Sequence, residues 1–509
     1  MIKRIFALLL VLLLAGLCAC SAPTEAELRA GEEERYLTLW SWQMPDPALA
    51  ADYAKAAREC GFTAIDLGVQ WSAFEPLRGQ FSWEWMDRVV EAFAKEGLKV
   101  SLQPLLWSKD LAWAEELTFQ ETKNGLFSVE GRGCFVSFTE EETLKIIENS
   151  IARFADHAAD YKETLCRWGV RLSSFGEFDY SLSESLDYSP SAAKAFRDYI
   201  KENYNSVQDF SAAFSMEISA WEELENLPCF DLAQACPLAW RRFRSACLTS
   251  LWERISPLFR EADEDVPIVF MLGTVGNSMN SNFSAVTDLF TLCDTLDFDQ
   301  LGVSLSDGVS PALLLSYVTS VTDKALCVEV DGAGAWEEGD KKTCAEQVSL
   351  CAAYGVTSLS TANFTLQQLE EHQAFLTAYQ TLFATEKSVE DCTADKGILL
   401  LTDGLILQNP PLGLETIYGE DFALLSENGR KKVQFLTDGM IAENPQCIKE
   451  ISELYTGKIK GTVPLPQKAA AALQEADVRI FVKDLILTTP AGDPFLPAHR
   501  LQTRSGTIQ

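Results

Sequence analysis

The chain has 509 residues, of which 47% are hydrophobic and 23% are charged. This composition is typical of a globular protein with a sizeable core, and it excludes a disordered or fibrous chain. Acidic residues outnumber basic ones by 74 to 42, which gives a formal net charge of -32. Such a field repels phosphate backbones, so nucleic acid is not expected as a partner, whereas a neutral, polar ligand is compatible with it.

The N-terminus is predicted to carry a sorting signal. Lys3 and Arg4 precede an apolar run at residues 5–17, which has the length of a signal-peptide core and is short for a membrane span. The run ends in Leu17-Cys18-Ala19-Cys20, which resembles the lipobox of bacterial lipoproteins. We predict a signal peptide at residues 1–19 and a lipid on Cys20, which would anchor the protein to the extracytoplasmic face of the cell membrane. An ordinary secretory signal cut after Ala19 is the alternative.

Residues 20–35 are acidic and lack apolar periodicity, so they are predicted to be a tether. Of the 14 cysteines, 12 lie beyond Cys20, none forms a C-x-x-C pair, and the chain has 3 histidines. Metal-site spacing is therefore missing, and neither a metal nor a cofactor is predicted. Most of these cysteines lie in apolar runs and are expected to be buried. The sequence leaves open whether disulfide bonds form; the pairs Cys229/Cys236 and Cys344/Cys351 are candidates because they are close in sequence.

Residues 36–384 alternate short apolar runs with longer amphipathic stretches. Strand-like runs lie at residues 37–42, 64–69, 99–105, 166–173, 267–272, 298–304, 325–330 and 357–361. Helical patterns lie at residues 47–60, 84–97, 141–157, 240–262 and 341–354, and Gly61, Gly97 and Gly355 follow three of them. A repeated strand-helix order requires parallel strands. The count of eight predicts an α/β fold of the TIM (β/α)8 barrel type, with a doubly wound open sheet as the alternative.

Two long connections, residues 107–140 and 177–266, follow the third and fourth predicted strands. That end of a barrel carries the active site, so we expect both to shape a ligand cleft. Beyond a charged linker at residues 385–396, strand-like runs at residues 397–401, 432–436 and 478–482 predict a smaller α/β domain over residues 397–509.

Two carboxylates stand at strand ends of the predicted barrel. Glu177 follows the fourth strand, and Glu329 lies near the end of the seventh. Cleavage of a glycosidic bond requires two carboxyl groups across a cleft, one to protonate the leaving oxygen and one to attack the anomeric carbon or activate water. Glu177 and Glu329 are therefore the predicted catalytic pair.

The same strand ends supply candidate ligand contacts. Sugar rings stack on aromatic faces, and Trp42, Trp71, Trp107 and Trp336 follow the first, second, third and seventh strands. A core role is the alternative for each of them, and it is the prediction for Trp83, Trp85, Trp168, Trp240 and Trp252. Predicted hydrogen-bonding partners of a substrate are Glu75, Asp179, Tyr180, Asn277, Asp331 and Asn363.

The segment Trp71-Ser-Ala-Phe-Glu75-Pro-Leu-Arg-Gly79-Gln-Phe81 resembles the opening of glycoside hydrolase family 42 and related clan A enzymes. Residues 196–222 resemble the segment after the acid/base glutamate of family 42 β-galactosidases. The resemblance covers residues 36–384. It implies a TIM barrel and a retaining double displacement, with Glu177 as acid/base, Glu329 as nucleophile, and an oligosaccharide, a β-galactoside among the candidates, as substrate.

One residue departs from that pattern. Clan A enzymes carry Asn directly before the acid/base Glu, and this chain has Gly176. Gly176-Glu177 followed by Tyr180 is closer to the Gly-Glu-x-x-Tyr of β-amylases, which invert. Three alternatives stay open: an inverting, β-amylase-like hydrolase, a barrel without catalysis that binds glycans, and an adhesive lipoprotein in which the two carboxylates do not converge.

Overall fold

The computed structural model describes residues 34–172, 178–180, 186–272, 289–305, 315, 318–319, 322, 324–331, 347–348, 351, 354–385, 396–402, 432–437, 461–464, 485–488, 502–503 and 506–507. The predicted signal peptide, the lipid site Cys20 and nearly all of the tether lie outside the described residues. Among the described residues, no helix is long and apolar enough to span a membrane.

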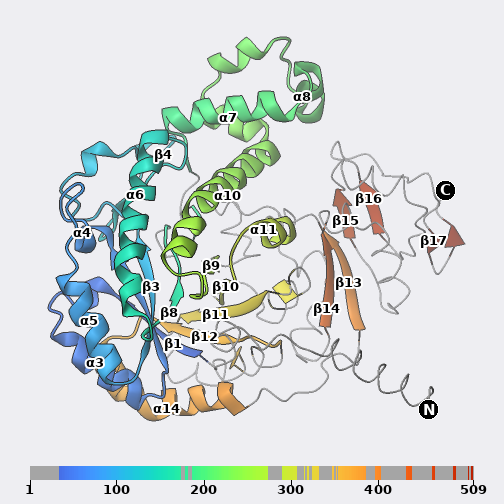
Figure 1. Ribbon diagram of the computed structural model, residues 1–509. Coiled ribbons are helices and arrows are strands. Elements are labelled where there is room, and N and C mark those ends of the chain that lie inside the picture. Colours follow the sequence, from blue (N-terminus) through green and yellow to red (C-terminus); the bar gives the residue numbers. More distant parts are fainter. Residues whose placement is uncertain are drawn as a thin grey trace, which may run out of the picture.

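Eight parallel strands form the centre of the protein (Figure 1). They are β1 (Glu34–Trp40), β2 (Ala64–Gln70), β3 (Lys99–Leu105), β8 (Leu165–Trp168), β9 (Val269–Met271), β10 (Gln300–Leu305), β11 (Ala325–Asp331) and β12 (Ser358–Ala362). The first strand pairs with the last, and a parallel bridge between Trp168 and Ile268 joins the two edge strands. The barrel prediction is therefore confirmed, and the open-sheet alternative is wrong.

The fourth strand is shorter than predicted. The apolar run at residues 166–173 predicted one strand, but β8 ends at Trp168 and the pairing resumes only as a single bridge between Leu105 and Arg171. The neighbouring strand offers Pro104 at this point, and proline has no N–H to donate to the ladder. The amide of Arg171 still donates to the carbonyl of Pro104 at 3.1 Å.

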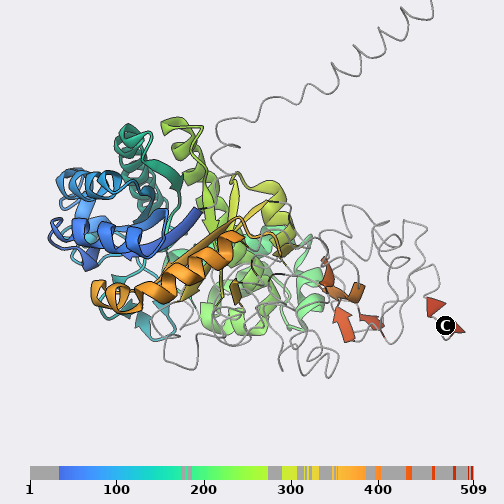
Figure 2. The same cartoon turned by 90° about the horizontal axis from the view of Figure 1, so that it is seen from below.

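Amphipathic helices cover the outside of the barrel (Figure 2). They include α3 (Leu49–Glu59), α5 (Glu84–Lys95), α6 (Glu141–Ala158), α10 (Pro237–Ala262) and α14 (Leu366–Thr385). The first four confirm helical patterns expected from the sequence, and the pattern at residues 341–354 lies almost entirely outside the described residues. After α3 the chain turns at Gly61, whose φ of 89° favours glycine.

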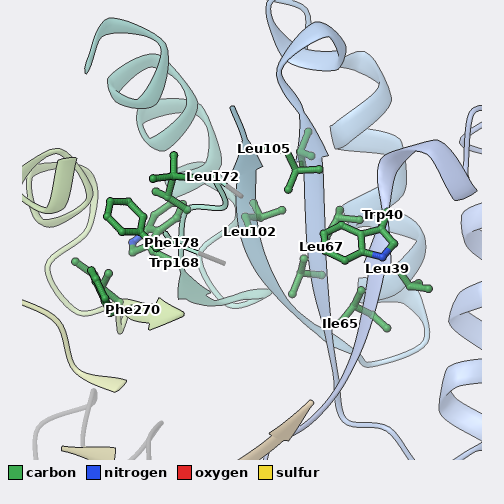
Figure 3. Packing of buried hydrophobic residues seen from close by; sticks show 14 of the residues in the cluster. Leu39, Trp40, Ile65, Leu67, Leu102, Leu105, Trp168, Leu172, Phe178 and Phe270 are labelled. Carbon is green, nitrogen blue, oxygen red and sulfur yellow. The ribbon is translucent and has the colours of Figure 1, made fainter. Parts of the chain in front are cut away.

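Alternation along the strands separates an apolar outside from a polar inside. Leu39, Ile65, Leu67 and Leu102 point outward into the core shown in Figure 3. The residues between them contact one another within the barrel: Asp66 on β2, for example, meets Gln103 on β3. Barrel interiors are usually filled by branched aliphatic side chains. This interior instead holds charged and amide groups, which require partners because they are buried.

Both long connections carry structure of their own. The first contains the hairpins β4 (Glu121–Thr122) with β5 (Gly125–Leu126) and β6 (Ser128–Val129) with β7 (Gly133–Cys134). The second contains α7 (Pro190–Asn203), α8 (Val207–Phe214) and α9 (Cys229–Ala235), which build a separate apolar cluster with the start of α10. This helical extension lies at the top of Figure 1.

In the C-terminal part, β13 (Lys396–Thr402) pairs in parallel with β14 (Lys432–Thr437). These strands match the runs expected at residues 397–401 and 432–436, and the run at residues 478–482 lies outside the described residues. A further parallel pair is formed by β15 (Gly461–Pro464) and β16 (Leu485–Thr488). The division into barrel, linker and α/β domain stays a prediction.

The cysteines that the structure describes are free thiols, and most are buried. They include Cys229 and Cys236, so the disulfide considered for this pair is not present. Burial raises the pKa of both thiols to about 12, which makes them unreactive at neutral pH.

Candidate active site

Glu329 lies in the interior of the barrel, two residues before the end of β11. Register places it beside Ser304 of β10 and Ser360 of β12. Its Oε2 accepts hydrogen bonds from Thr38 Oγ1 and from Arg171 Nη2, each at 3.1 Å. Among the described residues, no hydrogen bond to Oε1 is found. One carboxylate oxygen is therefore anchored, and the other is available for chemistry.

Arg171 and Asp66 belong to this site, although the sequence analysis did not identify them. Arg171 contacts Asp66 Oδ2 at 3.2 Å, and Arg167 contacts the same oxygen at 3.1 Å. Burial alone would raise the pKa of Asp66, but the positive charges of Arg167 and Arg171 outweigh it and lower the pKa below its usual value. Asp66 is therefore ionised at neutral pH.

Three stacked tryptophans lie above Arg171. The ring centroid of Trp42 is 5.1 Å from that of Trp40 and 5.5 Å from that of Trp107, with interplanar angles of 5° and 28°. The guanidinium carbon of Arg171 is 5.2 Å from the Trp40 ring centroid. Trp42 is 37% exposed, whereas Trp40 and Trp107 are 7% and 1% exposed. Of the three rings, that of Trp42 alone is exposed, and it packs against both of the others.

Trp107 is 1% exposed and supports the stack, which agrees with the core role given as its alternative. Its indole Nε1 donates to the carbonyl of Leu172 at 3.2 Å, and Phe135 and Arg132 cover its ring. The cause is the first long connection, which bridges back antiparallel to Trp107 through Phe135 and closes over it.

Asn363 is exposed directly after β12 and takes a left-handed φ of 67°. Its Oδ1 accepts a hydrogen bond from Trp40 Nε1 at 3.3 Å. The structure therefore brings two of the predicted residues, Trp42 and Asn363, into contact with Trp40.

Trp71 and Glu75 correct the sequence prediction, because both are completely buried. The short helix α4 (Trp71–Phe74) turns the indole of Trp71 toward its own i+4 residue, and Trp71 Nε1 donates to Glu75 Oε2 at 2.9 Å. Arg78, the amide of Gly79 and Ser150 supply the remaining donors to the carboxylate. Glu75 therefore ties a loop to α6 and does not face a ligand.

Asp179 and Tyr180 are also buried, at 2% and 1% exposed, and their role as ligand contacts stays a prediction. The guanidinium carbon of the buried Arg244 lies 4.2 Å from the centroid of the Tyr180 ring. Burial raises the pKa of Tyr180 well above its usual value and lowers that of Arg244. Among the predicted core tryptophans, Trp168, Trp240 and Trp252 are confirmed as buried, whereas Trp83 and Trp85 are partly buried against the core.

The remaining predicted residues stay predictions. Glu177, Asn277 and Trp336 lie outside the described residues, and Asp331 is described only as the last backbone position of β11. The segment that holds Glu177 connects Leu172 to Phe178, and both of these side chains pack beside Trp168 in Figure 3. No group of metal-ligating side chains is found in the part of the chain that the structure describes.

One sequence signal points to the residues that were missed. Asp66, Arg167 and Arg171 are ionised residues inside apolar strand-like runs, and Arg167, Gly169 and Arg171 alternate on one side of the chain. Burying a charge inside a barrel strand costs free energy unless the charge is paired. Acidic and basic residues in such strands are therefore expected to be partners of one another.

The barrel, with a carboxylate in its interior and a tryptophan stack beside it, places the protein in the class of (β/α)8-barrel proteins. Glycoside hydrolases belong to this class. The model of glycoside hydrolase family 42, described as β-galactosidase, matches residues 41–301, which is more than half of the chain. The protein belongs to glycoside hydrolase family 42.

Curated relatives are similar over part of their length. β-Galactosidase Pbg of Clostridium perfringens is 26% identical over 212 residues, which cover 39% of this chain and 29% of that protein. β-Galactosidase GalA of Bacillus licheniformis is 25% identical over 246 residues, which cover 45% of this chain and 34% of that protein. The chain thus spans about a third of the length of these relatives.

Solved structures agree on the fold. β-Galactosidase from Bacillus circulans sp. alkalophilus superposes with a TM-score of 0.65 at 12% identity, covering 91% of this chain and 73% of that one. The catalytic domain of β-amylase from Paenibacillus polymyxa superposes with a TM-score of 0.53 at 16% identity, covering 68% of this chain and 98% of that one. At these identities the likeness shows the fold alone.

Proposed function

We propose that the protein is a glycoside hydrolase that cleaves glycosidic bonds of oligosaccharides, with β-galactosides as the substrate class. The observation that carries the proposal is the interior carboxylate of Glu329, anchored through Oε2 by Thr38 and Arg171. Family membership and relatives named β-galactosidase support the substrate class.

In the proposed mechanism Glu329 is the nucleophile. Its Oε1 attacks the anomeric carbon while the acid/base carboxyl, assigned to Glu177 from its place in the chain, gives a proton to the leaving oxygen. Water, deprotonated by the same carboxylate, then attacks the glycosyl-enzyme and releases Glu329. Two displacements at one carbon retain the configuration of the anomeric centre.

The tryptophan stack supplies the proposed sugar platform. An aromatic face held by rings behind it loses little conformational entropy when a sugar stacks on it. The exposed ring of Trp42 meets this requirement, since Trp40 and Trp107 fix its position.

The test compares Glu329→Gln and Glu177→Gln with the wild type on aryl β-galactosides and other aryl glycosides. Both variants should lose turnover by at least about a thousand-fold while they stay folded by circular dichroism. Glu253→Gln, a change at an exposed glutamate on α10, is the matched control and should keep full activity. Wild-type activity in either active-site variant would reject the assignment.

Gly176 favours a second candidate, because an Asn amide expected before the acid/base Glu is missing. A β-amylase-like enzyme would use one carboxylate as a base and invert the anomeric centre. A binding protein without catalysis would take up glycans and form no product. Proton NMR of the first product distinguishes the three: β-anomer from a β-galactoside for retention, α-anomer for inversion, and no product for binding alone.

We also propose that Cys20 carries a lipid that anchors the protein to the cell membrane, on the basis of the Leu17-Cys18-Ala19-Cys20 motif. Cells that express the full chain should incorporate labelled palmitate into it and retain it in the membrane fraction. Cys20→Ala should abolish both, whereas Cys18→Ala should abolish neither. Equal labelling of the Cys20→Ala chain would contradict the proposal.

A further inference from the structure

Four buried side chains inside the barrel form a row in which the sign of the charge alternates: Arg167, Asp66, Arg171 and Glu329. Arg167 and Arg171 lie 3.1 and 3.2 Å from Asp66 Oδ2. The Nη2 of Arg171 that contacts Asp66 also lies 3.1 Å from Glu329 Oε2. One guanidinium nitrogen therefore contacts two carboxylates.

Arg171 is held in this shared position from further directions. Its Nε donates to Gln103 Oε1, and Gln103 Nε2 donates to Asp66 Oδ1. The Trp40 ring covers its guanidinium. The close packing of Gln103 depends on Gly169, because a Cβ there would lie 3.1 Å from the Gln103 amide carbon. The guanidinium is fixed between its two carboxylates.

The surroundings of Glu329 make Asp66 the relevant second charge. From β1 and β12 the neighbours are the hydroxyl groups of Thr38 and Ser360, which bond to each other at 2.6 Å. From β10 the register neighbour is Ser304. Within the described part of the chain, the charged group nearest to Arg171 in this network, apart from Glu329, is Asp66; behind it lies Arg167, which in turn interacts with Glu34 and with the Cys327 thiol.

We propose that Arg171 is a positioning residue for Glu329, and that Asp66 sets the share of the Arg171 charge that Glu329 receives. The inference rests on the proposed function, in which Glu329 attacks the anomeric carbon. A carboxylate that has a guanidinium to itself is a weaker nucleophile, and a buried carboxylate with no cation takes up a proton. Sharing orients the Glu329 carboxylate without giving it a guanidinium of its own.

Substitutions at the two residues should move the pH dependence of activity in opposite directions. Asp66→Asn is nearly isosteric and leaves Arg171 to Glu329 alone, so the acid limb of kcat/KM should move to lower pH. Arg171→Met removes the cation, so the acid limb should move to higher pH. Arg171→Lys restores a charge without the planar fork and should give an intermediate value. Glu253→Gln is the control and should move nothing.

The measurement is a ¹³C NMR titration of protein labelled at the glutamate carboxyls, with the Glu329 signal assigned by its loss in Glu329→Gln. The acid limb of kcat/KM against pH is the second readout, and it should move with the NMR midpoint while KM changes little. A structural role alone would lower stability and leave the midpoints in place. Shifts in the same direction, or an unmoved midpoint in Asp66→Asn, would overturn the inference. If Arg171→Met does not fold, Asp66→Asn and Arg171→Lys still decide it.

The two proposals fail in different ways. The NMR titration needs no turnover, so opposite shifts in a protein that cleaves no glycoside would support the charge sharing and reject the function. A protein that cleaves glycosides through Glu329 but shows no opposite shifts would keep the function and reject the charge sharing.

Discussion

The indole of Trp40 occupies the space that a side chain at Gly68 would need. A Cβ at Gly68 would lie 2.5 Å from Cε3 and 2.8 Å from Cζ3 of Trp40. The two residues face each other in register on β1 and β2, so the glycine lets the ring lie flat inside the barrel. Because Trp40 contacts both Trp42 and Arg171, this pair connects the sugar platform to the network around Glu329.

Gly68→Ala should therefore damage both stability and activity. The new methyl group must displace the Trp40 ring, and overpacking of this kind costs about 1–3 kcal/mol. We expect a lower urea midpoint of unfolding. We also expect kcat/KM to fall by more than the fraction of unfolded protein explains. Gly79→Ala is a control for glycine replacement with open space around the new Cβ, although its φ of 72° will itself cost stability. Unchanged kcat/KM in Gly68→Ala would contradict the connection.

Glu75→Gln should lower stability and spare catalysis. The buried carboxylate accepts bonds from Trp71, Arg78, Gly79 and Ser150, and a glutamine would turn an amide N–H toward donors. The unmatched groups cost about 1–3 kcal/mol, measurable as a lower Tm. Glu116→Gln, which removes the half-exposed second partner of Arg78, should change stability by less than about 1 kcal/mol. A large loss of kcat in folded Glu75→Gln protein would contradict a purely structural role and would indicate that Glu75 acts in the active site.

Asp187→Asn should be neutral or stabilising at pH 8. Burial raises the pKa of Asp187, so the folded state favours the protonated form, and its contribution to stability is full at low pH and is lost as pH rises through the folded-state value. Asn can keep every contact: Oδ1 accepts from the amides of Glu121 and Ser189, and Nδ2 can donate to the hydroxyls of Ser137 and Ser189. The Tm difference from wild type should shrink toward pH 4. A Tm loss at pH 8 as large as that of Asp187→Ala would contradict this account.

Trp42→Ala should weaken substrate binding without unfolding the protein. Loss of a stacking contact worth about 1.4 kcal/mol raises KM about ten-fold. Trp221→Ala is the matched control, because Trp221 packs in the helical extension, and it should lower Tm and leave KM unchanged. An equal KM for the two variants would remove Trp42 from the substrate platform.

The strands were predictable because each is an apolar run whose outward residues pack against helices, and β3 begins and ends where the sequence pattern does. The active-site network was not predictable from the sequence, because its members come into contact only when the strands close into a barrel. Arg171 is 105 residues from Asp66 and 158 residues from Glu329 in the chain. Trp71 shows the opposite error: position after a strand predicted a cleft, but a short helix turned its side chain into the core.

The most direct test of the central claim is covalent trapping of Glu329. 2-Deoxy-2-fluoro-β-galactosyl fluoride loses fluoride when a carboxylate attacks its anomeric carbon, and the electron-poor sugar slows hydrolysis of the ester that forms. Mass spectrometry of the digested protein should find one fluorogalactosyl group, on the peptide that contains Glu329, and none in Glu329→Gln. A sugar on a different residue, or an active enzyme that accumulates no adduct, would contradict the assignment of Glu329 as the nucleophile.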